Sequence, residues 1–371
     1  MTRTPLLKRE LKLRRPRQPK RTTDGGHRRL VGLKIGASRV SAAVVENNGA
    51  PTLVQFAYEP LAPGVVAAGE LREPLALTEA LRNFFKRYRL PTRGVRLGIA
   101  NNRIGVRTFE LPSVDRDHLE NAIRFRAQDA LPIPVEDAVL DYHILDERFG
   151  ESNPRVLLVV TYRELIEGFA GACRAAGLSL TGIDLEAFGM LRALNAPPAA
   201  GEPTRSSALV AVAIGHQRST VAVATGRSCE LTRVLEWGGA NLDGAITRAL
   251  SIPVEQAVAV KHALSLSAQT AGDEQTGRAR DAVLRELHSF GRQLVSSLHF
   301  YQNQPGSLEI GEIIITGGTS QLPGLAEELE RLVGAPVHVG DPLARVKLGK
   351  KVVADEGLGS LAVAIGLGIE D

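Results

Sequence analysis

The feature of this sequence that most limits its fold is an internal repeat. Residues 31–45 align with residues 210–224 at a constant offset of 179, and six of the fifteen positions are identical. In both copies an apolar run leads into glycine and polar residues and a second apolar run follows, which predicts two strands joined by a turn. A unit that occurs twice indicates two related half-domains. The identical pairs are Val31 and Val210, Ile35 and Ile214, Gly36 and Gly215, Arg39 and Arg218, Ala43 and Ala222, and Val44 and Val223.

The rest of the sequence extends each hairpin into an α/β half-domain. Apolar residues with period two predict strands, and those with period 3.6 predict helices. A segment rich in proline and small polar residues, 196–207, separates the halves and is typical of a linker. The predicted elements of the two halves are strands at 30–36, 40–45, 52–58, 229–235 and 312–316 and helices at 77–88 and 281–301.

The first half contains more residues than its hairpin and helix account for, and the additional segment shows its own alternating pattern of predicted strands and helices. Residues 104–177 predict a compact β-α-β-β-α subdomain that ends at Gly177. Its predicted elements are strands at 106–111, 138–145 and 156–161 and helices at 117–130 and 163–176. The predicted domains are a basic tail at 1–29, a first half at 30–103 and 178–200, the insertion at 104–177, and a second half at 207–371.

Positive charge is concentrated at the N-terminus. Residues 1–30 hold eleven Lys or Arg and two acidic residues, a net charge of +9, whereas the whole chain has +4 and the remaining 341 residues sum to −5. This composition predicts a disordered tail, and the absence of aromatic residues in it argues against nucleic-acid binding. Two interpretations stay open for the tail: a solvated extension, or an electrostatic tether to an anionic membrane surface.

Several other classes of protein are excluded by the apolar pattern. The longest uncharged apolar stretch, 358–369, has twelve residues, whereas a membrane-spanning helix needs about 20. The basic N-terminus lacks the apolar run of a secretory signal. Cys173 and Cys229 match neither a disulfide framework nor a metal-binding cysteine pair. We therefore expect a cytoplasmic protein with both cysteines in its core.

A series of segments outside the hairpins resembles one known family. In this order and at these spacings they are similar to the PilM-type pilus assembly proteins of the actin-like ATPase superfamily, and the resemblance covers residues 30–368. It implies a duplicated actin-like α/β fold that binds ATP between its halves, with the hairpin turns around the phosphates and a late Gly-Gly pair under the adenine. The segments are 58–64, 107–112, 130–136, 140–145, 182–188, 300–301, 317–325 and 361–367.

Two acidic residues of the family's hairpins are missing. The resemblance implies aspartates at the positions of Lys34 and Ala213, where they hold the hydrated Mg²⁺ beside the phosphates. Their replacement raises the local charge by three units, which disfavours Mg²⁺ and removes the metal that hydrolysis needs. We therefore expect no catalytic residue, no metal site, and ATP binding that is weak or absent and independent of Mg²⁺. By resemblance, the candidate nucleotide-binding residues are Lys34, Gly36, Ser38, Arg39, Gly215, Arg218, Gly317, Gly318 and Thr319.

The resemblance implies a cytoplasmic scaffold with a degenerate nucleotide cleft, peripheral to the inner membrane. PilM-type proteins bind the N-terminal peptide of the membrane protein PilN, associate with one another, and contact other pilus machinery proteins. We expect the insertion to receive this peptide on its edge strand, 106–111, or on its helix, 117–130. Two alternatives stay open: an active ATPase of pilus assembly, which would need both hairpin acids, and an FtsA-like cell-division protein, which would usually end in an amphipathic helix.

Overall fold

The computed structural model describes residues 29–111, 121–123, 125, 134, 137–145, 155–195, 206–226, 228–267, 273–355 and 357–370. Within these ranges the chain forms two compact units, a smaller one from Arg103–Ile166 and a larger one from the residues before and after it. The boundary at Ile166 falls within helix α3 (Arg163–Ala175). The basic tail, the linker up to residue 205 and most of the predicted helix 117–130 lie outside the described residues. The boundary predicted at residue 177 stays a prediction.

The first half of the larger unit is built on a six-stranded sheet, here called the first sheet. The predicted hairpin forms its centre, where β1 pairs antiparallel with β2 and parallel with β6. A two-stranded ribbon, β4 (Val66–Ala67) with β5 (Glu70–Leu71), and helix α1 (Pro74–Arg87) connect β3 to β6. The strands in spatial order are β10 (Ser179–Leu185), β6 (Arg93–Ile99), β1 (Arg29–Ile35), β2 (Arg39–Glu46), β3 (Thr52–Pro60) and β16 (Lys347–Leu348).

The second half repeats this arrangement in a five-stranded sheet, here called the second sheet. Strand β11 pairs antiparallel with β12 and parallel with β14, as β1 does with β2 and β6. The same strand order in both halves confirms the duplication predicted from the 179-residue offset. The strands in spatial order are β13 (Ser228–Leu235), β12 (Ser219–Thr225), β11 (Ala208–Ile214), β14 (Ile310–Thr316) and β15 (Val337–Val339).

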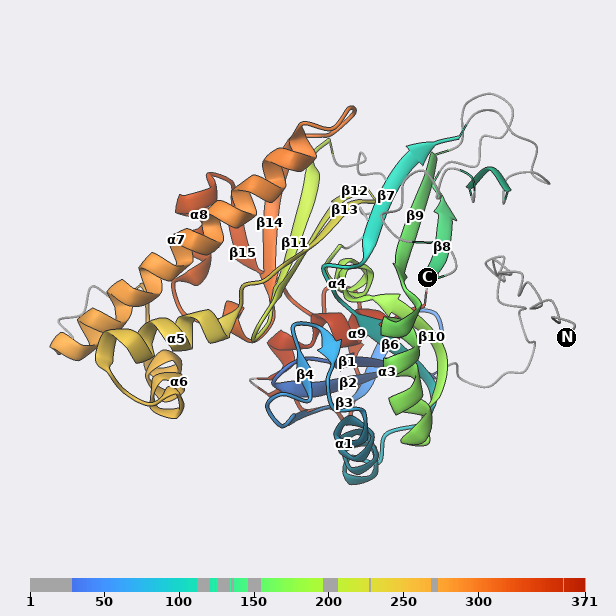
Figure 1. The fold of residues 1–371 in the computed structure, drawn as a ribbon, viewed down its shortest axis with the longest axis horizontal. Coiled ribbons are helices and arrows are strands. Elements are labelled where there is room, and N and C mark those ends of the chain that lie inside the picture. The colour runs from blue at the N-terminus through green and yellow to red at the C-terminus, as the bar shows by residue number, and fades with distance from the viewer. Residues whose placement is uncertain are drawn as a thin grey trace, which may run out of the picture. The chain divides into compact units, whose positions relative to one another are not determined.

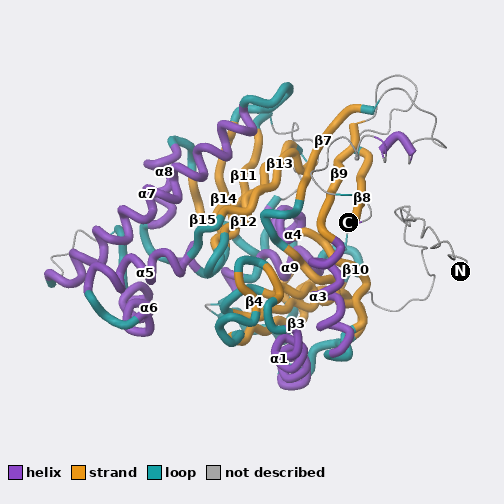
Figure 2. The backbone as a smooth tube through the Cα atoms, in the orientation of Figure 1, coloured by secondary structure: helices purple, strands orange, loops and turns teal. Residues whose placement is uncertain are grey.

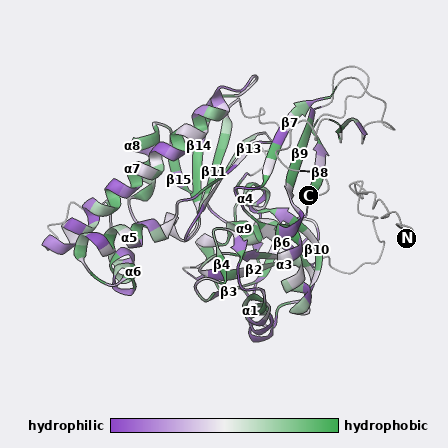
Figure 3. Ribbon diagram, viewed as in Figure 1, coloured by the Kyte–Doolittle hydropathy of each residue, from purple (hydrophilic) through white to green (hydrophobic). Residues whose placement is uncertain are grey.

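Helices α7 and α8 contact the second sheet, whereas α5 packs on α7 and α6 lies beside α5 (Figures 1 and 2). The longest, α7, contacts α5, α8 and β13, and its buried residues include Phe290, which stacks on Trp237 with ring centroids 4.2 Å apart. Figure 3 shows alternating polar and apolar stretches along α7, whereas β11 is buried throughout. The aromatic ring of Trp237 is therefore part of the core of the second half. The helices are α5 (Gly239–Leu250), α6 (Val254–Ala263), α7 (Glu274–Gln302) and α8 (Leu325–Val333).

Two helices join the two sheets. Helix α4 (Glu186–Leu194) contacts β11 and β12 of the second sheet, and helix α9 (Ala362–Gly368) contacts β1, β2 and β6 of the first. The two helices pack closely on each other because they meet at Gly189 and Gly366. Beyond β15 the chain thus returns to the first sheet, so β16, the short helix η3 (Leu358–Ser360) and α9 belong there, whereas the sequence predicts a second half that extends over 207–371. The apolar run at 361–369 fits this buried position.

The smaller unit is a three-stranded antiparallel sheet with the order β7-β9-β8. Its strands confirm those predicted for the insertion to within one residue at every end: β7 (Gly105–Glu110), β8 (Ala138–Ile144) and β9 (Arg155–Tyr162). Residues 121–123 and 125 are helical, and Ile123 packs against the sheet in a small core with Leu111 and Leu158. Within the described residues β7 pairs only with β9 and is an edge strand, as predicted.

Both cysteines lie in the core of the larger unit as free thiols. Burial raises the pKa of each to about 12, so neither ionises near neutral pH. None of the helices in the described ranges is long and apolar enough to span a membrane.

Candidate functional site

The two predicted hairpin turns have the same geometry. The backbone N–H of Gly36 donates to the carbonyl oxygen of Arg39, and that of Gly215 donates to the carbonyl oxygen of Arg218. The N···O distance is 2.9 Å in both turns. The carbonyl oxygen of Ser38 accepts a hydrogen bond from the N–H of Leu61 at 2.9 Å, which ties the first turn to the end of β3. The structure thus places Gly36, Ser38 and Gly215 in paired turns, although their contact with a phosphate stays a prediction.

Lys34, which occupies the position of the first missing acid, forms an ion pair inside the protein. Its Nζ lies 3.1 Å from Oε2 of Glu186, and the two side chains are 20% and 8% exposed. Glu186 is the first residue of α4, where a carboxylate is also favoured by the positive end of the helix dipole. The extra positive charge expected from Lys34 is therefore neutralised locally. Sequence reasoning missed Glu186 because it lies far along the chain.

Arg39 also contacts protein groups. Its guanidinium donates to Oγ of Ser360 in η3 and lies 5.6 Å from the centre of the Tyr58 ring. Burial lowers the pKa of Arg39, and the nearby Tyr58 raises it. The side chain of Arg39 therefore holds η3 against the first half, and the sequence pattern offered no sign of Ser360 as its partner.

The late glycine loop meets the second hairpin turn. Gly317 has φ +97°, and a Cβ there would overlap the carbonyl oxygen of Ile214, so only glycine fits this close approach. Oγ1 of Thr319 donates to the carbonyl oxygen of Gly215 at 3.2 Å. Gly318 is different, because no described atom lies within 4 Å of the position that its Cβ would take. The structure therefore brings Gly215, Gly317 and Thr319 together and leaves open space beside Gly318.

A buried ion pair lies next to this loop and was not predicted. Nζ of Lys261 in α6 is 2.6 Å from Oδ1 of Asp243 in α5, and Asp243 is only 2% exposed. A Cβ on Gly239 would lie 2.7 Å from Oγ1 of Thr319 and 3.4 Å from this Nζ. Burial lowers the pKa of the nearby His216, Asp243 raises it and Lys261 lowers it, so His216 favours its neutral form. No spacing rule singles out two residues of different helices.

Arg218 extends toward the first half. A Cβ on Gly69, in the β4–β5 turn, would overlap its guanidinium, and its Nη2 lies 3.5 Å from a carboxylate oxygen of Glu236. Burial lowers the pKa of Arg218, whereas Glu236 and Glu70 raise it. Of the cations expected at the phosphates, Lys34, Arg39 and Arg218 thus all contact protein groups.

The residues present do not fit a Mg²⁺–ATP pair held in the manner the family implies. Ala213 is buried in β11 and has no ligand atom on its side chain, and Lys34 replaces the other acid. In the part of the chain that the structure describes, no group of three or more His, Cys, Asp or Glu side chains is placed to hold a metal ion. The backbone turns and the space beside Gly318 are compatible with a nucleotide, whereas the positions of Lys34 and Ala213 offer no carboxylate for a metal.

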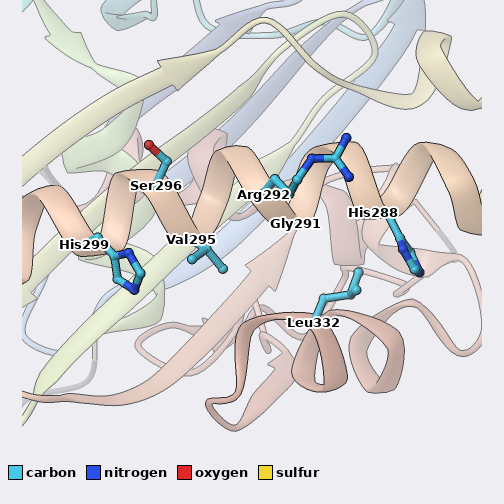
Figure 4. Close-up of a pocket in the computed structure, with 7 residues that line it drawn as sticks. All are labelled: His288, Gly291, Arg292, Val295, Ser296, His299 and Leu332. Atoms are coloured by element: carbon cyan, nitrogen blue, oxygen red, sulfur yellow. The ribbon is translucent and has the colours of Figure 1, made fainter.

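A separate hollow of about 460 Å³ lies on the outer surface between α7 and α8 (Figure 4). Its lining includes Arg292 and His299 of α7 and Leu332 of α8, which no sequence motif had indicated. It contains none of the candidate nucleotide-binding residues.

The duplicated halves, the paired hairpin turns and the late glycine loop define the class of actin-like ATPase folds. Solved structures of this class are similar in fold. MreB5 of Spiroplasma citri bound to ADP matches with a TM-score of 0.53 and 12% identity over 91% of this chain and 94% of that chain. The ethanolamine utilization protein EutJ from Carboxydothermus hydrogenoformans matches with a TM-score of 0.55 and 16% identity over 92% and 90%.

The family is narrower than this class. The family model described as type IV pilus assembly protein PilM matches residues 32–371, so this chain belongs to that family. A chain in the solved structure of the PilM-PilN type IV pilus biogenesis complex is 25% identical, with a TM-score of 0.77, and the match covers 92% of this chain and 98% of that chain. The resemblance drawn from the sequence is confirmed.

Proposed function

We propose that this protein is a cytoplasmic scaffold of type IV pilus assembly that binds the N-terminal peptide of a PilN-like membrane protein and has a degenerate nucleotide site. The main support for a degenerate nucleotide site is the ion pair between Lys34 and Glu186. It puts a cation at a position where the family resemblance implies an acid that holds Mg²⁺. The peptide-binding role is supported by the match to the chain in the PilM-PilN complex.

Nucleotide binding can be separated from folding at Gly318. Because its Cβ would enter open space, Gly318→Leu should leave the midpoint of thermal unfolding almost unchanged and remove any ATP binding measured by calorimetry. The unsubstituted protein should bind ATP weakly or not at all, with the same affinity in Mg²⁺ and in EDTA, and its phosphate release should match a buffer blank.

The control for this experiment is Gly317→Ala, in which φ +97° and the overlap with Ile214 should lower stability directly. Magnesium-dependent phosphate release that Gly318→Leu abolishes would contradict the degenerate site and support the alternative of an active ATPase. No structural observation favours the FtsA-like alternative over membership of the PilM family.

For the peptide we propose the smaller unit as the receiving surface. Its edge strand β7 can add a strand from an extended peptide, and Phe125, on the helical segment of the same unit, is 66% exposed. An exposed aromatic side chain is the type of residue that dominates peptide interfaces.

Phe125→Ala should therefore weaken binding of a labelled PilN-like N-terminal peptide by about tenfold, a loss of about 1.4 kcal/mol. Fluorescence anisotropy measures the affinity. The matched control is Leu75→Ala in α1, which truncates a side chain that is 85% exposed in the larger unit and should leave the affinity unchanged. Equal affinities for both variants and the original protein would place the peptide elsewhere.

Three further associations belong to this proposal. Self-association and contacts with other pilus machinery would build the scaffold at the inner membrane. The basic tail, residues 1–29, would add an electrostatic contact with anionic lipids, to which each cation near the surface contributes about 1 kcal/mol. Because the membrane-anchored partner already supplies attachment, the tail would strengthen it through avidity.

A further inference from the structure

Loops from the two halves touch directly beside the second hairpin turn. The N–H of Ala68, in the β4–β5 turn, donates to Oε1 of Gln217 at 3.1 Å. Nδ2 of Asn102, after β6, donates to Oε1 of Glu236 at 2.7 Å, and Nη2 of Arg218 lies 3.5 Å from the same oxygen. The hydrogen bonds of Ala68 to Gln217 and of Asn102 to Glu236 join the first half to the second, and the Arg218–Glu236 contact lies within the second half beside them.

The β4–β5 turn is shaped to receive Arg218. Ala68 and Gly69 have φ +51° and +68°, and a Cβ on Gly69 would overlap the guanidinium and lie 2.6 Å from the carbonyl oxygen of Ala100. Asn101 is buried, and its Nδ2 donates to the carbonyl oxygen of Gly69 at 3.0 Å, which stabilises the turn. The left-handed backbone at Ala68 is unfavourable for a residue with a side chain, so the turn keeps this form at a cost.

Among the described residues, not all hydrogen-bond donors of Arg218 have a partner in its contact with the β4–β5 turn. In the part of the chain that the structure describes, Nε and Nη1 of Arg218 are buried and have no hydrogen-bond partner. Buried donors without partners destabilise the closed arrangement, since water would satisfy them if the halves moved apart. The attractive contacts of Gln217 and Glu236 oppose this tendency. Because the unsatisfied donors of Arg218 favour opening and the contacts of Gln217 and Glu236 favour closure, the two halves can separate here without either half unfolding.

We propose that Gln217, Arg218 and Glu236 form a releasable clasp on Ala68, Gly69 and Asn102 that holds the two halves closed without a nucleotide. In an actin-like fold without a metal site, these side-chain contacts would hold the two halves together in place of a bound Mg²⁺–nucleotide. When the clasp releases, the halves separate about the crossing of α4 and α9, the two helices that connect the sheets. This inference concerns the larger unit alone and holds whether or not the smaller unit binds the peptide.

The test measures the distance between the halves by double electron–electron resonance. Spin labels are attached to cysteines introduced at Lys86 in α1 and Glu255 in α6, both exposed, in the full chain. The natural Cys173 and Cys229 are buried thiols and should not be labelled. We expect one narrow distance distribution that is the same with no nucleotide, with ATP and EDTA, and with ATP and Mg²⁺.

Replacing both Gln217 and Arg218 with alanine should shift the mean distance upward by more than the width of the original distribution. Gly69→Val should give the same shift by a second route, because it pushes Arg218 out while leaving every clasp side chain present. The matched control is Arg233→Ala, since Arg233 contacts Ser297 and Phe300, which both belong to the second half. Circular dichroism verifies that each variant is folded.

Two results would overturn the clasp. One is a distribution in the folded double variant and in Gly69→Val that equals the original. The other is an original protein that is open without nucleotide and closes only when ATP is added. Neither result depends on the peptide affinity, so failure of the clasp and failure of the proposed scaffold role are distinguishable.

Discussion

Gly366→Val is expected to destabilise the larger unit by at least about 3 kcal/mol, because overpacking against backbone atoms cannot be relieved by a change of rotamer. A Cβ at this position would overlap the carbonyl oxygen of Gly189, and it would lie 2.6 Å from the carbonyl carbon of Gly189 and 3.1 Å from the amide nitrogen of Ala193. All seven residues of α9 are buried, so α9 cannot move outward without leaving the core. Denaturant unfolding of the full chain measures the loss.

The matched control is another helical glycine, Gly277 in α7. No described atom lies within 4 Å of the position of its Cβ, and the residue is exposed. Gly277→Ala should therefore increase the free energy of unfolding by about 0.5–1 kcal/mol, since alanine restricts the unfolded chain and has a higher helix propensity. A Gly366→Val protein with the original unfolding midpoint would contradict the close crossing of α4 and α9.

Glu186→Ala should produce the second large loss, about 3 kcal/mol, because it leaves the Lys34 ammonium largely buried without its counter-charge. The double variant that also carries Lys34→Met should recover most of this stability, since it removes the charge and keeps apolar contacts. Denaturant unfolding of the two single variants and the double variant gives their coupling energy. Additive losses would mean that the ion pair contributes little.

A reversal of charge at the same position tests the proposal that this protein has no metal site. Lys34→Asp would place a second carboxylate beside Glu186, and we expect Mg²⁺ to raise the unfolding temperature of this variant but not that of the original protein. A magnesium-dependent rise in the original protein would show that a metal site persists in spite of Lys34.

The strands of the hairpins and of the insertion could be predicted because their signals are local. The apolar runs and the glycine at each turn predict the two hairpins, and in the structure Ile35 pairs with Val40 and Ile214 with Ser219 at equivalent places. Helix ends were less accurate. Helix α7 begins seven residues before the predicted start at 281, since the Asp273 side chain accepts a hydrogen bond from the N–H of Thr276 and caps the helix there. That capping residue was visible in the sequence but lies outside the apolar stripe used to place the helix.

The sequence by itself determined the duplication, the family and the loss of both acids in the hairpins, because each depends on which residue stands at a given position in the chain. The tertiary structure alone decided what the replacement cations contact. Lys34 meets Glu186, Arg39 meets Ser360, and Arg218 reaches Gly69, across separations of more than 100 residues in every case. Such partners depend on which segments the two sheets and the α4–α9 crossing bring together, and neither hydrophobic period nor residue spacing encodes that three-dimensional neighbourhood.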